Sequence, residues 1–149
     1  MKFYYNNKAS SDDNAPAQES STIAPIQLIL PKASEEASLL SGTTGVEAEN
    51  NKIYFYCQVT DEKVLALNKL LMKMDAELSI LAINLGLETT FPIELHINSP
   101  GGDLFSGFAA YDYIRRCKNP VHTYVDGQAA SAASLMSIAG KKRFITENS

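Results

Sequence analysis

The sequence predicts a single α/β domain in which helices flank a mostly parallel sheet. From residue 52 onward, short segments rich in β-branched and aromatic residues alternate with longer segments of helical periodicity, which is typical of consecutive βαβ units. The chain has 149 residues, of which 45% are hydrophobic, and this is enough for one packed core.

The N-terminal third has a different composition. We expect residues 1–51 to be a polar, disordered arm and residues 52–149 to form the folded domain. Asn6–Thr22 has too few apolar side chains to offset the entropy that is lost on ordering. Ile23–Leu30 is apolar but ends at Pro31, so it is at most a short strand or docking segment.

The domain is predicted to begin with a strand and a long helix. Ile53–Val59 is β-branched and aromatic, as a buried strand would be. Thr60 and Asp61 then cap a helix that ends near Gly86. Apolar side chains recur in this helix at steps of three and four, which favours core packing over an oligomer seam; they are Val64, Leu67, Leu71, Met74, Leu78 and Leu81.

Two further strand–helix pairs follow. Residues in Pro92–Asn98 alternate between apolar and polar as a strand would, and the proline suits an edge strand or the beginning of a strand. The second helix is expected to contain Leu104, Phe108, Tyr111 and Ile114, with Arg115, Arg116 and Lys118 at its end and Pro120 beyond it. The remaining elements are a strand over Val121–Val125, a helix over Ser131–Gly140 and a strand beginning in Arg143–Thr146.

Composition excludes several classes of function. The formal net charge is -4, and scattered Lys and Arg residues provide no basic face for nucleic acid or an anionic membrane. The sequence shows neither a secretion signal nor an apolar run near the roughly 20 residues that a membrane helix needs, so we expect a cytosolic protein. Cys57 and Cys117 lack metal-site spacing and are interpreted as reduced thiols.

A run of small residues, Gly127–Ser134, lies between the strand at Val121–Val125 and the next helix. Small side chains permit a sharp turn close to a neighbouring strand. Ser131 would then lie at the amino end of the helix, where free N–H groups and the helix dipole favour the negative charge of a reacting carbonyl. The plain alternative is that Ser131 is only an N-cap in a tightly packed turn.

A second motif, His96–Asp103, contains a Pro-Gly-Gly turn between a strand and a helix. Gly101 and Gly102 can present backbone N–H groups there with no side chain in the way. Together the two motifs predict a nucleophilic serine and an oxyanion hole.

These residues resemble the proteolytic subunit of the Clp protease, a serine peptidase of the Clp/crotonase superfamily. The resemblance rests on Asn98–Gly102, on Ala110–Asp112 in the following helix and on Gly127–Ser131, and it covers about Ile53 to Ser149. It implies a Clp/crotonase-like spiral of repeated ββα/βαβ units, incomplete at the C-terminus.

The same resemblance implies roles for individual residues. Ser131 would be the nucleophile, and the backbone N–H groups of Gly101 and Ala132 would form the oxyanion hole, whereas Ser134 lies outside the motif and is interpreted as a packing residue. No cofactor or metal is implied. The implied partners are self or paralogous subunits in a heptameric or tetradecameric ring, an AAA+ unfoldase, and unfolded protein or peptide substrates.

The family's catalytic histidine and acidic residue have no counterparts after Ser131 in this sequence. His122 precedes Ser131 by too long a stretch of strand to reach its hydroxyl, and we interpret both His122 and His96 as structural. The chain alone is therefore expected to be nearly inactive.

Three alternatives stay open at this point. The chain could be a catalytically dead structural or regulatory subunit of a mixed Clp ring, or a phage-type head-maturation protease. A crotonase-like acyl-CoA enzyme is a further alternative, although Gly127–Ser131 argues against it.

Overall fold

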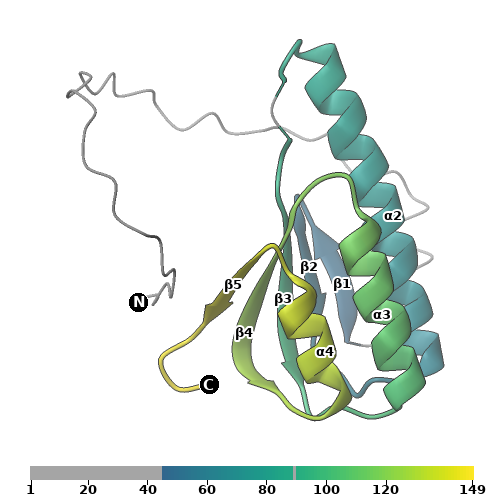
Figure 1. Cartoon of the computed structure of the whole chain (residues 1–149), viewed down its shortest axis with the longest axis vertical. Coiled ribbons are helices and arrows are strands. Elements are labelled where there is room, and N and C mark those ends of the chain that lie inside the picture. The colour runs from purple at the N-terminus through teal and green to yellow at the C-terminus, as the bar shows by residue number, and fades with distance from the viewer. Residues whose placement is uncertain (1–44, 89) are drawn as a thin grey trace, which may run out of the picture.

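The computed structural model describes residues 45–88 and 90–149, which form one sheet with helices on one of its faces (Figure 1). The elements are β1 Val46–Glu49, β2 Lys52–Phe55, α2 Asp61–Asn84, β3 Ile93–Ser99, α3 Leu104–Arg116, β4 Val121–Ala129, α4 Ala132–Ala139 and β5 Lys142–Ile145.

The sheet has the strand order β1-β2-β3-β4-β5 in the described residues. Strands β2 to β5 are parallel, and β1 alone runs antiparallel to its neighbour β2. Each parallel pair is joined by a crossover that contains a helix, which is why helices collect on one face. The predicted α/β class with a mostly parallel sheet is confirmed.

Strand β1 lies within the stretch 1–51 that the sequence assigns to the arm. Val46 pairs with Phe55 and is 1% exposed, so within the described residues the sheet already includes Val46–Glu49, ahead of Lys52. Only Val46 in this strand is buried, which explains why composition did not reveal it. The predicted strand or docking segment at Ile23–Leu30 lies outside the described residues.

Helix α2 follows its sequence signals closely. The Thr60 hydroxyl oxygen accepts a hydrogen bond from the Lys63 N–H at 3.3 Å, as an N-cap does. At the other end Gly86 has a φ of 63°, and the Leu87 N–H bonds to the Ala82 carbonyl at 3.0 Å. The predicted apolar stripe packs in the core, with Leu81 only half-buried, and its buried members are Val64, Leu67, Leu71, Met74 and Leu78.

Strand β3 occupies the centre of the sheet, between β2 and β4. Pro92 precedes the strand, so the interpretation as a strand beginning is confirmed and that as an edge strand is wrong. Its side chains alternate between the helix-covered face, where they are buried, and the opposite face, where they are half-buried.

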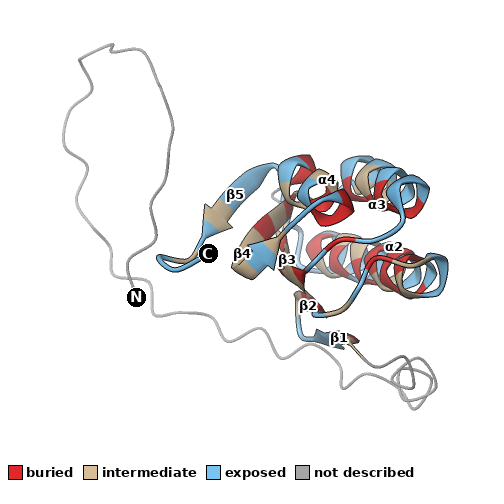
Figure 2. Cartoon of the chain, turned by 90° about the horizontal axis from the view of Figure 1, so that it is seen from below, coloured by how far each residue is buried: buried red, intermediate tan, exposed pale blue. Residues whose placement is uncertain are grey.

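Helix α3 forms as predicted, and of the four apolar residues expected in it, Ile114 is buried and Tyr111 packs partly buried against the core. Leu104 is 51% exposed and Phe108 is 48% exposed. The buried positions of α3 are Ser106, Gly107, Ala110 and Ile114. Figure 2 shows both buried and exposed residues along α3. A Cβ atom at Gly107 would lie 3.0 Å from the Ala132 carbonyl oxygen. The small residues therefore face inward because α3 and α4 pack closely together.

No helix in the described ranges is long and apolar enough to cross a membrane.

Candidate active site

Ser131 lies at the junction where β4 ends and α4 begins, and its side chain is exposed. Its φ of 49° and ψ of -126° are unusual for a residue with a side chain. Such a conformation costs on the order of 1–3 kcal/mol and persists only where the surroundings enforce it. Ser131 stands at the N-cap position but makes no side-chain capping hydrogen bond, so its hydroxyl is not used as a cap.

The turn around Ser131 is fixed by backbone hydrogen bonds. The Ala130 N–H donates to the Ser99 carbonyl at 3.1 Å, which ties the turn to the end of β3. The Ser134 N–H donates to the Ser131 carbonyl at 3.0 Å and starts the helix. The serine is thus held at the carboxyl edge of the parallel sheet, where α/β folds place their sites.

Gly101 lies directly against this turn, so the structure brings the two predicted motifs together. A Cβ atom at Gly101 would lie 2.5 Å from the Ala130 carbonyl oxygen, 2.7 Å from the Ser131 Cβ and 3.1 Å from the Ala132 nitrogen. Gly101 also has a φ of 91°, which disfavours any residue with a side chain. Glycine is needed here for both reasons.

The backbone N–H groups at this turn differ in their partners. The Gly101 N–H donates to the Ser99 hydroxyl at 3.2 Å, whereas the Ala132 N–H is the first of α4 and has no acceptor within the helix. The Val59 N–H donates to the Gly101 carbonyl, and the Val59 carbonyl accepts from the Asp103 N–H, each at 2.9 Å. In this parallel bridge the Gly102 N–H between them points away from Val59. Within 45–88 and 90–149 the Gly102 N–H has no acceptor.

Asp103 anchors the helix that follows the glycines. Its carboxylate accepts a hydrogen bond from the Ser106 N–H at 2.6 Å, and the bonds to Ser106 lower the pKa of Asp103. The Ser106 hydroxyl also donates to Asp61 at the start of α2. These contacts hold the first turns of α2 and α3 together beside the glycine turn.

His96 is placed on the face of the sheet that no helix covers. Its Nδ1 pairs with the Asp126 carboxylate at 2.7 Å, and its ring stacks between those of Tyr54 and Tyr124 at 5.0 and 4.7 Å. Its Nε2 is buried, and the Glu94 carboxylate is 3.7 Å away. His96 is therefore hydrogen-bonded, in line with its interpretation as a structural residue.

His122 also lies away from Ser131, near the start of β4. Its ring contacts Phe144 edge to face at 6.2 Å, and burial followed by the charge of Lys142 lowers its pKa. Neither His96 nor His122 makes a hydrogen bond to Ser131 in the part of the chain that the structure describes. In the described ranges, therefore, neither histidine is hydrogen-bonded to Ser131 as a general base would be.

The partners of His96 could not be predicted from the sequence. Asp126 also accepts a hydrogen bond from the Tyr56 hydroxyl at 2.7 Å, and burial followed by this bond raises the pKa of Tyr56 to about 12. Alternation along each strand places these side chains on one face, but only the register between β3 and β4 brings His96 and Asp126 together. No linear spacing signals the pair.

The two cysteines are free thiols. Burial raises the pKa of both Cys57 and Cys117, the latter to about 11, so neither has the character of a nucleophile. In the described ranges, no cluster of His, Cys, Asp or Glu has a composition and geometry that would hold a metal ion.

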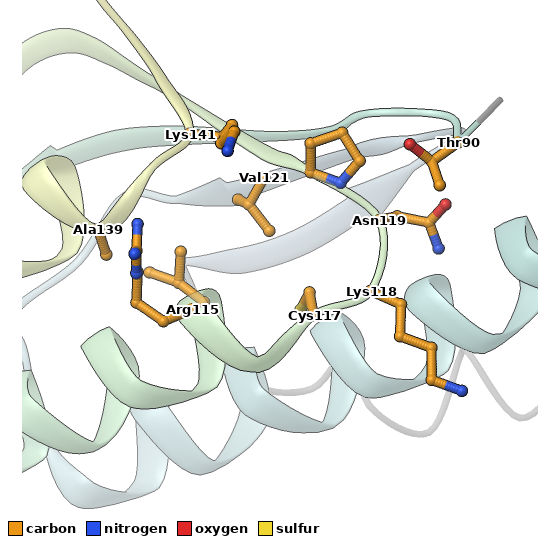
Figure 3. Close-up of a pocket in the computed structure, with 10 residues that line it drawn as sticks. Thr90, Arg115, Cys117, Lys118, Asn119, Val121, Ala139 and Lys141 are labelled. Carbon is orange, nitrogen blue, oxygen red and sulfur yellow. The ribbon is translucent and has the colours of Figure 1, made fainter.

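A cavity of about 430 Å³ lies at the opposite end of the sheet from Ser131 (Figure 3). It is bounded by the end of α3 and the start of β4, and its lining includes Arg115, Asn119 and Lys141. Because β4 begins at Val121 and Ser131 follows its other end, this cavity is separate from the serine turn.

An exposed serine at a strained strand-to-helix turn of a parallel sheet is an arrangement that serine hydrolases use for their nucleophile. The family model of the Clp protease matches residues 47–149, and the chain belongs to the Clp protease family.

Curated relatives agree with this assignment. The chain is 40% identical over 97 residues to the ATP-dependent Clp protease proteolytic subunit of Carsonella ruddii, covering 63% of this chain and 50% of the relative. It is 49% identical over 65 residues to proteolytic subunit 2 of Treponema denticola, covering 42% of this chain and 32% of the relative. The chain thus spans half or less of the length of these relatives.

A solved structure supports the fold. ClpP1 from Listeria monocytogenes superposes with a TM-score of 0.51 and 26% identity, covering 60% of this chain and 46% of that one. The Clp/crotonase-like fold that the sequence resemblance implied is therefore confirmed.

Proposed function

We propose that this chain is part of the proteolytic subunit of a Clp-type ATP-dependent protease, a serine endopeptidase that cleaves unfolded proteins through an acyl-enzyme at Ser131. The observation that carries the proposal is the strained, exposed Ser131 packed against Gly101 at the start of α4. Strain of this kind is retained at functional sites, where the surrounding structure maintains it.

In the proposed reaction the Ser131 Oγ attacks the carbonyl carbon of a peptide bond, and the negative charge collects on the carbonyl oxygen. The Ala132 N–H and the Gly101 N–H stabilise this oxyanion, assisted by the positive end of the α4 dipole. For this, the Gly101 N–H exchanges its bond to Ser99 for the substrate oxygen. The leaving amine takes up the proton that the Ser131 hydroxyl loses, and water then hydrolyses the acyl-enzyme and returns a proton to Ser131.

The proposed mechanism needs a general base, and neither described histidine contacts Ser131. We therefore assign activity to the complete, assembled protein and expect residues 1–149 alone to be nearly inactive. By analogy with the named function of the relatives, the proposed partners are further copies or paralogues in a ring and an ATP-driven unfoldase. The proposed compartment is the cytoplasm.

The test is covalent labelling of the protein from its native source by a fluorophosphonate. The Ser131 Oγ bonds to phosphorus, fluoride leaves and the hydroxyl proton is lost. We expect Ser131→Ala to abolish labelling and Gly101→Ala to lower it at least tenfold, because the added Cβ would collide with Ser131. Ser79→Ala, a change in α2, is the matched control and should label normally. Undiminished labelling of Ser131→Ala would refute the proposal.

A catalytically inactive ring subunit is the second candidate, favoured by the lack of contact between Ser131 and either described histidine. It predicts association with a longer paralogue that Ser131→Ala leaves unchanged. It also predicts that the isolated ring resists the fluorophosphonate, so the same labelling experiment separates the two candidates.

A further inference from the structure

Three hydroxyl groups donate to backbone carbonyls of α4 and of Ser131 just before it. The Ser134 hydroxyl donates to the Ser131 carbonyl at 2.6 Å, and the Ser137 hydroxyl donates to the Ser134 carbonyl at 2.9 Å. The Thr123 hydroxyl of β4 then donates to the Ser137 carbonyl at 2.7 Å. The first of these bonds ends on the strained residue itself.

The Ser131 carbonyl is bound twice by Ser134, once by its N–H at 3.0 Å and once by its hydroxyl at 2.6 Å. This carbonyl shares one planar peptide unit with the Ala132 N–H. Fixing the direction of the carbonyl therefore fixes the direction of that N–H, which is the proposed oxyanion donor.

We propose that Ser134 is a positioning residue: its hydroxyl holds the Ser131–Ala132 peptide plane so that the Ser131 hydroxyl and the Ala132 N–H face the same substrate carbonyl. This inference rests on the proposed function and deepens it. Ser134 acts only through the peptide unit that it holds and touches no reacting atom.

The chain contains a matched control for this idea. Serine hydroxyls often bond to a carbonyl one turn back in a helix with no functional consequence. Ser137 makes the same kind of bond in the same helix, but its acceptor is the Ser134 carbonyl, within regular helix rather than at the strained residue. A purely structural role predicts equal effects of removing either hydroxyl.

The experiment compares fluorophosphonate labelling rates of the full protein with Ser134→Ala, Ser134→Thr or Ser137→Ala. We expect Ser134→Ala to slow labelling about fivefold, the factor that one hydrogen bond typically represents. Ser134→Thr keeps a hydroxyl that can bond back, so it should restore the rate. Ser137→Ala should label like the unaltered protein at a similar melting temperature. Equal rates for both alanine variants would overturn the proposal.

A second measurement does not depend on catalysis. The residual dipolar coupling of the Ala132 N–H, measured by NMR, reports the direction of that bond. We expect it to change in Ser134→Ala and to stay unchanged in Ser137→Ala, and an unchanged coupling in both variants would overturn the positioning role. If the unaltered protein fails to label while the coupling shifts as expected, the proposed peptidase function fails and the positioning of the peptide plane stands.

Discussion

The two faces of the sheet are built from the same strands but are held together differently. On the helix-covered face, Ile53, Leu95 and Ile97 are fully buried against the helices. On the open face, the neighbouring residues Tyr54 and His96 are only half-buried and stack on one another across the strands. Alternate residues of one strand thus experience an apolar interior and a partly solvated surface.

The difference shows how each face is stabilised. The covered face is stabilised by the removal of apolar area from water, an effect that is not directional. The open face carries stacked rings and the Asp126 carboxylate, which binds both the Tyr56 hydroxyl and the His96 Nδ1. Interactions of that kind depend on direction and contribute less energy each.

The largest effect should come from the covered face. We expect Leu95→Ala to lower the free energy of unfolding by about 3 kcal/mol, because it removes buried methyl groups and leaves a cavity. The matched change on the open face, Tyr54→Leu, should cost about 1 kcal/mol through the lost ring stacking. Denaturant unfolding of both variants measures the difference, and equal costs would contradict the comparison.

A middle-sized effect is expected at the centre of the open face. Asp126→Ala removes the acceptor of the Tyr56 hydroxyl and the partner of the His96 Nδ1, and should cost about 2 kcal/mol of stability. Asp126→Asn retains an acceptor oxygen and should cost less. Denaturant unfolding at neutral pH provides the comparison, and a larger loss in the asparagine variant would argue against this hydrogen-bond account.

The smallest effect concerns the alkaline limit of the open face. Because the pKa of Tyr56 is raised to about 12, the folded protein holds this proton more tightly than the unfolded chain does. Its contribution to stability is complete below about pH 10 and is lost as the pH rises through the folded pKa. When tyrosine ionisation is followed by absorbance, Tyr56→Phe should remove a tyrosine that ionises only at high pH, near its raised pKa. If the variant instead loses a tyrosine that ionises near the ordinary pKa, the pKa of Tyr56 is not raised.

Local signals in the sequence predicted local structure well. The capping residue Thr60, the terminal Gly86 and the apolar stripe between them define α2, because each acts within a few residues of itself. Strand β1 was missed because it buries only Val46. In α3, the large residue Phe108 is half exposed, because contact with α4 requires the small Gly107 to face inward.

The sequence by itself determined the α/β class, most of the elements and the two motifs that carry the family resemblance, because periodicity and turn chemistry are encoded locally. Only the tertiary structure decided that Gly101 lies against Ser131, that Ser131 adopts a positive φ, and that His96 pairs with Asp126. These relations join residues far apart in the chain, and they follow from strand register and helix packing, which depend on the whole core rather than on any single segment.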